Sequence, residues 1–275
     1  MTSLTHSPAP ARILIVAGSD SGGGAGIQAD IKTVTALGGF AMTAITAITV
    51  QNTLGVHGVE GLDPGLVRRQ MQVVLADIGA DAIKTGMLHS AAIIEAVAQA
   101  IADYDEVPAL VVDPVMVASS GDRLLQRDAE AALIGRLMPQ AFMVTPNIHE
   151  AAVLADMPVR TAADMRDAAR ALLASGPDCV LVTGGDLGGD VVMDVLATPA
   201  EIRTFASPRI ETRATHGTGC TLASAIATRL GQGADVVDAV EDARDYVREA
   251  IRHAPGFGAG NGPLDHAWRL RTPED

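Results

Sequence analysis

The sequence predicts an α/β protein built on a mostly parallel central sheet, and two observations lead to this prediction. Short apolar segments typical of buried strands alternate with longer segments whose apolar residues recur at the 3.6-residue period of a helix. Hydrophobic residues make up 48% of the 275 residues but aromatic residues only 3%, so Ala, Val, Ile, Leu and Met must fill most of the core. Such a core suits helices packed on a parallel sheet that is buried on both faces.

Strand-like and helix-like segments follow one another as far as Val182. Helices between successive strands are typical of βαβ units, whose strands are parallel. The expected strands are Arg12–Ala17, Met42–Val50, Asp81–Lys84, Ala109–Val112, Ala141–Val144 and Cys179–Val182. The expected helices are Ile27–Leu37, Pro64–Asp77, Ala91–Ala102, Arg127–Leu137 and Ala162–Ala174.

The pattern changes after Gly185. Two short segments, Val191–Leu196 and Glu201–Ala206, are separated by Ala197-Thr198-Pro199, which predicts an antiparallel hairpin at an edge of the sheet. Two further helices are then expected before a Gly/Pro-rich tail, at Thr218–Leu230 and Ala234–His253.

Charge and cysteine content restrict what the protein binds and where it acts. The net charge of −13, with no offsetting run of Lys and Arg, works against binding to nucleic acid or to an anionic membrane. Cys179 and Cys220 lie far apart, without the spacing of a zinc site or a disulfide framework, which indicates a reducing, cytoplasmic setting. Residues 1–11 lack the apolar stretch of a signal peptide and are expected to form a disordered leader before a single domain at 12–275.

Five glycines fall within nine residues between Gly18 and Gly26, directly after the first strand. A plain turn rarely needs so many, and ligands bind at the carboxyl ends of parallel strands, so this segment is expected to approach a ligand closely. It is not a P-loop, because no Gly-Lys-Ser/Thr ends it. Residues Gly24–Ala29 fit the looser dinucleotide pattern, but no acidic residue for a ribose occurs between Lys32 and Gly58, so a dehydrogenase is the weaker interpretation.

A second glycine-rich segment, Thr215–Thr221, opens an apolar helix. Unpaired N–H groups at such a helix start bind anions. The helix dipole is expected to lower the pKa of the Cys220 thiol, which makes Cys220 a candidate proton acceptor or nucleophile. The alternative is that Cys220 only packs against its neighbours. His216 in the same segment is expected to support the site through hydrogen bonds rather than to titrate.

Two acidic residues follow two of the expected strands. Asp113 comes directly after Val112, and Glu150 lies six residues after Val144, so both carboxylates are expected at the same edge of the sheet. Carboxylate oxygens are the ligands that Mg²⁺ prefers, and Asn147 is placed to cap the helix that follows. The alternative for each residue alone is a helix cap or a solvated acid.

Six separated motifs together resemble the hydroxymethylpyrimidine/phosphomethylpyrimidine kinases, members of the ribokinase-like superfamily. The resemblance runs from Arg12 to about His266 and implies a three-layer α/β/α sandwich, a homodimer, and successive ATP-dependent phosphorylation of 4-amino-5-hydroxymethyl-2-methylpyrimidine and its monophosphate. The motifs are Gly18–Asp30, Gln51-Asn-Thr, Lys84-Thr-Gly-Met-Leu88, Asp113-Pro-Val-Met116, Asn147 with Glu150, and His216-Gly-Thr-Gly-Cys220.

The resemblance also implies roles for individual residues. Gln51 would hydrogen-bond the pyrimidine, in a pocket lined by Gly18, Asp30, Met87 and Val115. The anion hole would be formed by Gly217, Thr218, Gly219 and Cys220, with Cys220 as the base. ATP would be contacted by Lys84, Asn147, Thr183 and Gly185, and Mg²⁺ would be organised by Asp113 and Glu150.

Two positions depart from the family pattern, and three other functions compete with the kinase. Ala259 and Thr183 stand where the family or several relatives have a lysine that contacts phosphate. A pyridoxal/pyridoxine kinase of the same branch is one alternative, although Gln51-Asn-Thr favours a pyrimidine. The other two alternatives are a weakly catalytic pyrimidine-binding protein and the dehydrogenase described above.

Overall fold

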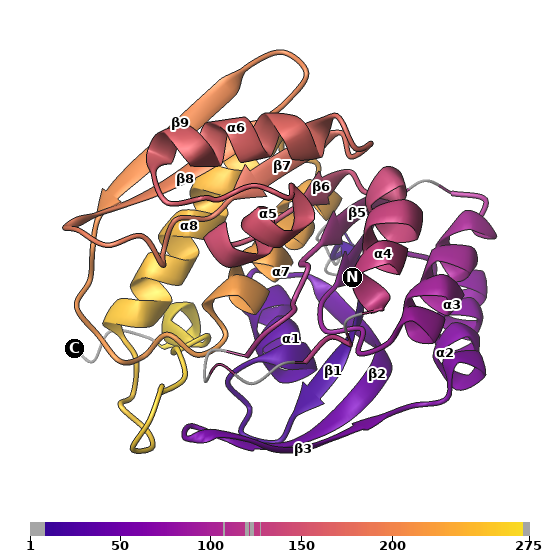
Figure 1. Ribbon diagram of the computed structural model, residues 1–275. Coiled ribbons are helices and arrows are strands. Elements are labelled where there is room, and N and C mark those ends of the chain that lie inside the picture. Colours follow the sequence, from indigo (N-terminus) through magenta and orange to yellow (C-terminus); the bar gives the residue numbers. More distant parts are fainter. Residues whose placement is uncertain (1–8, 107, 119–120, 122–123, 127, 272–275) are drawn as a thin grey trace, which may run out of the picture.

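A nine-stranded sheet runs through the molecule, in the strand order β3-β2-β1-β4-β5-β6-β7-β8-β9 (Figure 1). In the computed structural model, residues 9–106, 108–118, 121, 124–126 and 128–271 are described. The six strands from β2 to β7 in this order are parallel, and an antiparallel strand, β3 or β8, follows at each end. The mostly parallel sheet expected from the sequence is confirmed.

The strands and helices follow the predicted alternation closely. The strands are β1 (Arg12–Asp20), β2 (Phe40–Asn52), β3 (Gly55–Gly61), β4 (Ala82–Thr85), β5 (Ala109–Val112), β6 (Met143–Val144), β7 (Cys179–Val182), β8 (Val191–Ala197) and β9 (Ile202–Pro208). The α-helices are α1 (Gly26–Ala36), α2 (Pro64–Asp77), α3 (Ala91–Ala102), α4 (Ala129–Ala132), α5 (Ile148–Leu154), α6 (Ala162–Leu173), α7 (Thr218–Gly231) and α8 (Val236–Arg252).

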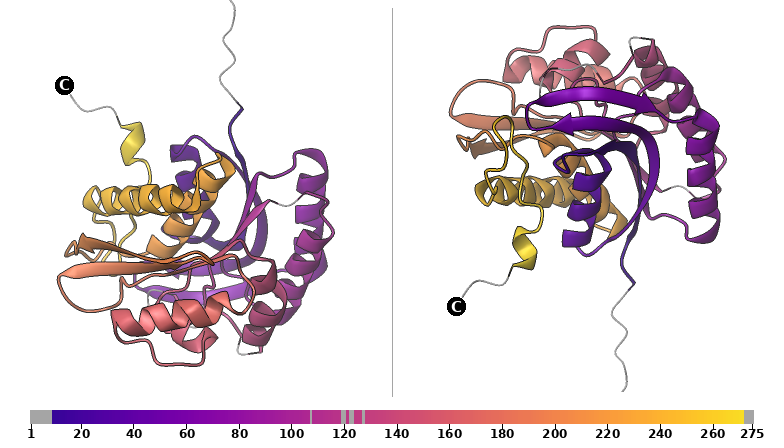
Figure 2. Two further views of the ribbon diagram at one scale, coloured as in Figure 1. Left: turned by 90° about the horizontal axis from the view of Figure 1, so that it is seen from above. Right: turned by 90° about the horizontal axis from the view of Figure 1, so that it is seen from below.

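Helices cover both faces of the sheet, which confirms the three-layer sandwich (Figure 2). Successive side chains of a strand point to opposite faces, so β1 contributes to two cores. Leu14 and Val16 pack in the core that also contains residues of α2, α3 and α6, whereas Ile13 and Ile15 pack in the core with residues of α1, α7 and α8. Because both faces are covered, the parallel strands are apolar almost throughout.

Three elements differ from the prediction. The strand β3 was not expected, because Gly55–Gly61 contains three glycines and lacks a continuous apolar run. The predicted helix Arg127–Leu137 is wrong in type over its second half, since Leu133–Leu137 forms a π-helical turn, and Arg127 lies outside the described residues. The strand expected at Ala141–Val144 is only the two residues Met143–Val144.

The carboxyl ends of the parallel strands place the chemically active residues at one edge of the sheet. Asp113 directly follows β5, Thr145 directly follows β6 and Thr183 directly follows β7. On this edge of an open α/β sheet, the loops leave a crevice for a ligand. The predicted leader at residues 1–11 lies outside the described part of the chain as far as residue 8.

The C-terminal segment connects two parts of this edge. The Asn261 N–H donates to the Thr53 carbonyl oxygen at 2.9 Å, in the turn between β2 and β3. One residue later, the Gly262 carbonyl oxygen accepts from the His216 N–H at 3.1 Å, just before α7. The segment therefore joins the β2–β3 hairpin to the start of α7.

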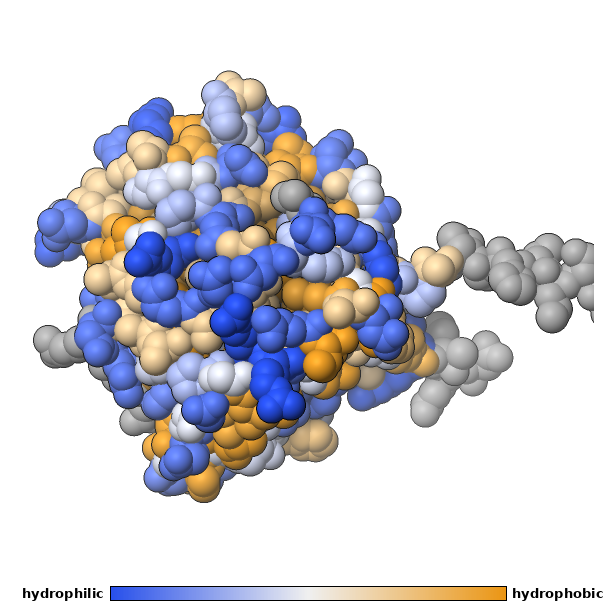
Figure 3. All heavy atoms as spheres, turned by 90° about the vertical axis from the view of Figure 1, so that its right-hand side faces the viewer, coloured by the Kyte–Doolittle hydropathy of each residue, from blue (hydrophilic) through white to orange (hydrophobic). Residues whose placement is uncertain are grey.

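The surface on the side of α2 and α3 is mixed in character, because hydrophilic residues interrupt the apolar ones (Figure 3). Within the described ranges, no helix is both long and apolar enough to span a membrane.

Candidate active site

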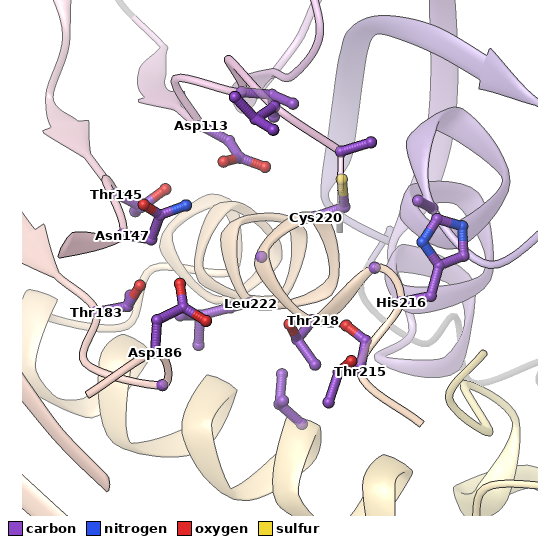
Figure 4. Close-up of a pocket in the computed structure, with 18 of the residues that line it drawn as sticks. Asp113, Thr145, Asn147, Thr183, Asp186, Thr215, His216, Thr218, Cys220 and Leu222 are labelled. Carbon is purple, nitrogen blue, oxygen red and sulfur yellow. Dashed lines mark hydrogen bonds between the residues drawn. The ribbon is translucent and has the colours of Figure 1, made fainter. Parts of the chain in front are cut away.

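A cavity of about 700 Å³ lies at the carboxyl ends of the strands. Figure 4 shows His216 at one end and Thr183 with Asp186 at the other, with Cys220 and Asp113 between them. The cavity is also lined by most of the predicted site residues, namely Gly18, Gln51, Met87, Val115, Asn147, Glu150, Gly185, Gly217, Thr218 and Gly219.

The glycine-rich segment after β1 is organised by its own carboxylate. Asp20 accepts hydrogen bonds from the N–H groups of Gly22 at 2.7 Å, Gly24 at 2.9 Å and Ala25 at 2.9 Å. These N–H groups are therefore used inside the loop and do not form a phosphate cradle. The sequence drew attention to the glycines, but Asp20 within the same motif was overlooked.

The glycines instead allow two loops to approach each other. Gly217, the N-cap residue of α7, has φ +86°, and a Cβ there would overlap the carbonyl oxygen of Gly24. No side chain caps this helix. The N–H groups of its first turn, which form the positive end of the helix dipole, therefore have no side-chain acceptor. The predicted anion-binding geometry at Gly217, Thr218, Gly219 and Cys220 is compatible with this helix start.

Replacing Gly217 with alanine is expected to lower turnover by at least about tenfold, because the added Cβ must push the two loops apart. The matched control is Gly233→Ala. Gly233 has a similar φ of +87°, but nothing lies within 4 Å of a Cβ at that position. Steady-state kinetics of both variants distinguish the separation of the loops from the strain of a positive φ. Equal losses of turnover would show that backbone strain is responsible.

The Cys220 thiol does not have the predicted lowered pKa. Burial raises the pKa of Cys220 to about 12, and the carboxylates of Asp113 and Asp30 act in the same direction, against the opposing Lys84 ammonium. The helix dipole was the only effect visible in the sequence, whereas the fold places the sulfur beside two acids. The thiol is protonated at neutral pH and lies close enough to the Asp113 carboxylate for the two groups to affect each other's pKa.

Lys84 and Asp30 do not reach the cavity wall, contrary to the roles expected for them. Both side chains are fully buried, and Lys84 Nζ lies 2.9 Å from Asp30 Oδ1 and 3.6 Å from Asp113 Oδ2. Ser224 on α7 also donates to Asp30 Oδ1, at 2.7 Å. Burial lowers the pKa of Lys84, but the neighbouring Asp30, Cys220 and Asp113 together more than reverse this, so the pKa is raised overall. Lys84 is thus a charged support beneath the site rather than a group that contacts ATP directly.

Asp113 and Glu150 form a pair of buried acids at the centre of the cavity. Burial raises the pKa of Asp113 to about 6, while burial and the Asp113 charge together raise the pKa of Glu150 to about 8. Asp113 Oδ2 has no hydrogen-bond partner among the described residues. This oxygen is buried and lies 3.6 Å from Lys84 Nζ, so a divalent cation would approach the two carboxylates from the cavity, where it would relieve their repulsion; the residues present fit Mg²⁺ in this way.

Glu150 also belongs to a helix cap. The Asn147 side chain accepts from the N–H of Glu150 at 2.9 Å, and the Glu150 carboxylate accepts from the N–H of Asn147 at 3.0 Å. This reciprocal arrangement is a capping box, so the prediction that Asn147 caps a helix is confirmed. The cap fixes the position of Glu150 relative to the cavity.

The end of the cavity near Thr183 is built from polar loops and apolar walls. Asp194 accepts from the Gly184 N–H at 2.9 Å and from Arg244 Nε at 2.7 Å, which holds the loop after β7 in place. Arg209 donates to the carbonyl oxygens of Gly185, at 2.8 Å, and Leu187. No local pattern in the sequence indicates a role for these residues, because their partners are distant along the chain. Apolar walls at this end come from Val192, Ile210, Leu222, Val247 and Ile251.

The opposite end contains Gln51, beside His216 and Thr49. Gly18 packs so closely against Met87 that a Cβ on Gly18 would overlap the Met87 methyl group, and both residues line the cavity. Ala259 is exposed and does not line the cavity. The ring-binding residues predicted at Gln51, Gly18, Met87 and Val115 are thus brought together, whereas Asp30 lies behind them.

The chain is similar to known proteins over most of its length. The family model of phosphomethylpyrimidine kinase matches residues 20–265. A hydroxymethylpyrimidine/phosphomethylpyrimidine kinase of Streptomyces coelicolor is 48% identical over 98% of this chain and 99% of the relative.

Two solved structures are similar over most of the chain. An ADP complex of Bacillus subtilis pyridoxal kinase has a TM-score of 0.87 and 36% identity, covering 96% of this chain and 100% of the other. A phosphomethylpyrimidine kinase from Clostridium difficile has a TM-score of 0.78 and 39% identity, covering 88% of this chain and 99% of the other.

Proposed function

The chain belongs to the phosphomethylpyrimidine kinase family, and from this premise we propose that it phosphorylates 4-amino-5-hydroxymethyl-2-methylpyrimidine and then its monophosphate, using ATP. The observation that carries the proposal is one cavity, lined by Gln51 and His216 as well as by Thr183, in which Cys220 at the start of α7 lies between His216 and Thr183. A hydroxymethyl group bound at Gln51 and a γ-phosphate approaching from Thr183 would meet beside Cys220. The pyrophosphate product is used to make thiamine.

The nucleotide occupies the end at Thr183 in this proposal. Its base packs against the apolar wall, and its phosphates lie along Asn147, Thr183 and Gly185 towards α7. The N–H groups of Gly217, Thr218, Gly219 and Cys220 then face the phosphoryl group that is transferred, where the helix dipole stabilises negative charge.

Cys220 acts late in the transfer. Its thiol is protonated in the resting protein, so it is not a strong base at the start of the reaction. Phosphoryl transfer has a loose transition state, in which the acceptor hydroxyl becomes much more acidic once its bond to phosphorus begins to form. Cys220 orients this hydroxyl, and as the hydroxyl proton moves to the sulfur at that stage, the thiol proton moves to the neighbouring Asp113 carboxylate.

Asp113 and Glu150 would hold Mg²⁺, consistent with the raised pKa values and the unpartnered Asp113 oxygen described above. When bound, the cation supplies positive charge that neutralises the phosphates during transfer. Lys84 balances the Asp113 carboxylate from the interior.

The test is consumption of ATP by the purified protein with the pyrimidine alcohol, its monophosphate and pyridoxal supplied separately, with products identified by mass. We expect turnover of both pyrimidines in the presence of Mg²⁺ and none after chelation. Turnover of the free alcohols alone would limit the activity to the first step and assign a cost to the missing lysines at 183 and 259. Preference for pyridoxal would favour the alternative suggested by the similar fold of the pyridoxal kinase. No turnover with any of them would favour the binding-protein alternative.

We also propose that the protein is a cytoplasmic homodimer. Three large apolar side chains of β2 and the adjoining turn are exposed, at 44% for Ile48, 61% for Val50 and 66% for Leu54. They lie beside the edge strand β3, and a second copy of the chain would remove them from water. Sedimentation velocity of the full chain measures this directly.

A further inference from the structure

A chain of hydrogen-bonding groups surrounds the Gln51 side chain. His216 Nε2 lies 2.9 Å from Asp20 Oδ2 and 3.3 Å from one end of the Gln51 amide. At the other end of that amide, Thr49 Oγ1 is 3.3 Å away, and the same Oγ1 is 3.0 Å from the Ser19 carbonyl oxygen. Asp20, Thr49 and His216 are buried, whereas Gln51 is half-buried and lines the cavity.

The proton on His216 is fixed by Asp20. Burial opposes ionisation of Asp20, but the hydrogen bonds from His216 and from the loop N–H groups outweigh it and lower the pKa of Asp20. An ionised carboxylate can only accept, so His216 Nε2 must carry its hydrogen and donate it. A nitrogen that donates its only hydrogen cannot also accept one from the Gln51 amide. The group of Gln51 that faces His216 can only share this hydrogen with Asp20 as a second acceptor, which the amide oxygen can do and the amide nitrogen cannot.

The Thr49 side leads to the same orientation independently. The Ser19 carbonyl oxygen can only accept, so the single hydrogen of the Thr49 hydroxyl is directed there. The lone pairs of Thr49 Oγ1 can then accept from an N–H of Gln51, but cannot donate to its oxygen. The group of Gln51 that faces Thr49 must therefore be its nitrogen.

The two ends of a primary amide have nearly the same shape, and their hydrogen-bond partners decide which is which. The structure has Gln51 Nε2 on the side of His216 and Oε1 on the side of Thr49, which places donor against donor and acceptor against acceptor. Turning the amide over removes both mismatches, because Thr49 Oγ1 then accepts from a Gln51 N–H and the Gln51 oxygen shares the His216 hydrogen with Asp20.

We propose that Asp20, His216 and Thr49 are positioning residues that lock the Gln51 amide in this turned orientation and thereby set which ring edge the site accepts. The locked amide presents an acceptor on the His216 side and a donor on the Thr49 side. An aminopyrimidine offers the complementary order, with its amino group towards His216 and its ring nitrogen towards Thr49. This inference rests on the proposed function, since it concerns the ring that the proposed kinase binds.

A ring in which the hydrogen-bond donor and acceptor are exchanged distinguishes a fixed Gln51 orientation from a purely structural role of Asp20, His216 and Thr49. In 5-hydroxymethyl-2-methylpyrimidin-4(3H)-one the exocyclic group is an acceptor and the neighbouring ring nitrogen is a donor. We expect the unaltered protein to prefer the amino compound over this analogue by about 10²-fold in kcat/KM, because a locked amide leaves both contacts of the analogue unpaired.

The double variant His216→Leu, Thr49→Val frees the amide to turn. We expect it to lower this preference by about tenfold, through a higher KM for the amino compound and a lower KM for the analogue, with little change in kcat. His216→Gln should keep the preference within about twofold, since its side-chain N–H can replace the histidine N–H towards Asp20. His149→Leu, at another histidine that lines the cavity, is the matched control and should leave the preference unchanged.

An equal loss of activity for both rings in the double variant would contradict the proposal. It would show that His216 and Thr49 support the structure of the site without fixing the orientation of the Gln51 amide. The proposal would also be contradicted if His216→Gln behaved like the double variant. Calorimetric titration of each ring without ATP gives the same ratio from Kd values. A protein that binds the rings but phosphorylates neither would therefore refute the kinase function, while the Kd ratio would still decide the inference. Equal affinity of the unaltered protein for the two rings would overturn it.

Discussion

Replacing Cys220 with alanine is expected to lower kcat by about 10²-fold or more while changing the KM for ATP by less than about threefold. The sulfur lies between the two ends of the cavity, near Asp113, so its removal affects the hydroxyl that reacts rather than the bound nucleotide. Steady-state ADP production at varied ATP measures both constants. Because the thiol is protonated at neutral pH, the effect reflects lost orientation and late proton uptake.

The other cysteine provides the matched control for this experiment. Cys179 is buried in β7 and is not among the residues that line the cavity. Cys179→Ala should therefore keep kcat within about twofold, with a modest loss of stability from the small cavity that it leaves. Full turnover by Cys220→Ala would refute its catalytic role, and a similar loss in both variants would indicate that general packing is responsible.

Replacing Lys84 with methionine is expected to reduce the free energy of unfolding by about 3–5 kcal/mol, one of the largest losses that a single change can cause in this chain. The Lys84 ammonium group lies between the carboxylates of Asp30 and Asp113. Its loss leaves both buried carboxylates without this positive charge. Urea denaturation, followed by circular dichroism, gives this quantity.

Two further variants test the electrostatic origin of the Lys84 effect. In the Lys84→Met background, Asp30→Asn removes one of the uncompensated charges and should restore part of the lost stability. Lys32→Met changes an exposed lysine on α1 and should shift the unfolding free energy by less than about 0.5 kcal/mol. If Lys84→Met unfolds at the same urea concentration as the unaltered chain, the buried ion pairs do not stabilise the fold.

Much of the fold could be predicted from the sequence because its main signal is periodic. The segments Ala109–Val112 and Cys179–Val182 coincide with β5 and β7, and Pro64–Asp77 coincides with α2. The signal failed where the periodicity is weak. Gly55–Gly61 becomes a strand through pairing with β2, and that pairing is not encoded in its own residues.

The candidate site was predicted best where residues follow strand ends. Asp113, Thr183 and Glu150 line the cavity as expected, because chain order and parallel strands together bring them to one edge. The depth of a side chain could not be predicted in the same way. Lys84 lies on a strand that is buried on both faces, and its partner Asp30 is 54 residues away, so nothing local indicated an internal ion pair.

Residues 261 and 262 connect the β2–β3 turn to the start of α7, and this connection also bears on how the chain folds during its synthesis. A ribosome adds residue 208, and with it the last strand of the sheet, about fifty residues before this connection. A nascent chain can thus build its central sheet while the contacts that tie Thr53 to His216 are still absent. Assembly of the catalytic apparatus is consequently a late event in translation, and a chain released after α8 but before residue 261 would lack the connection between the β2–β3 turn and the start of α7.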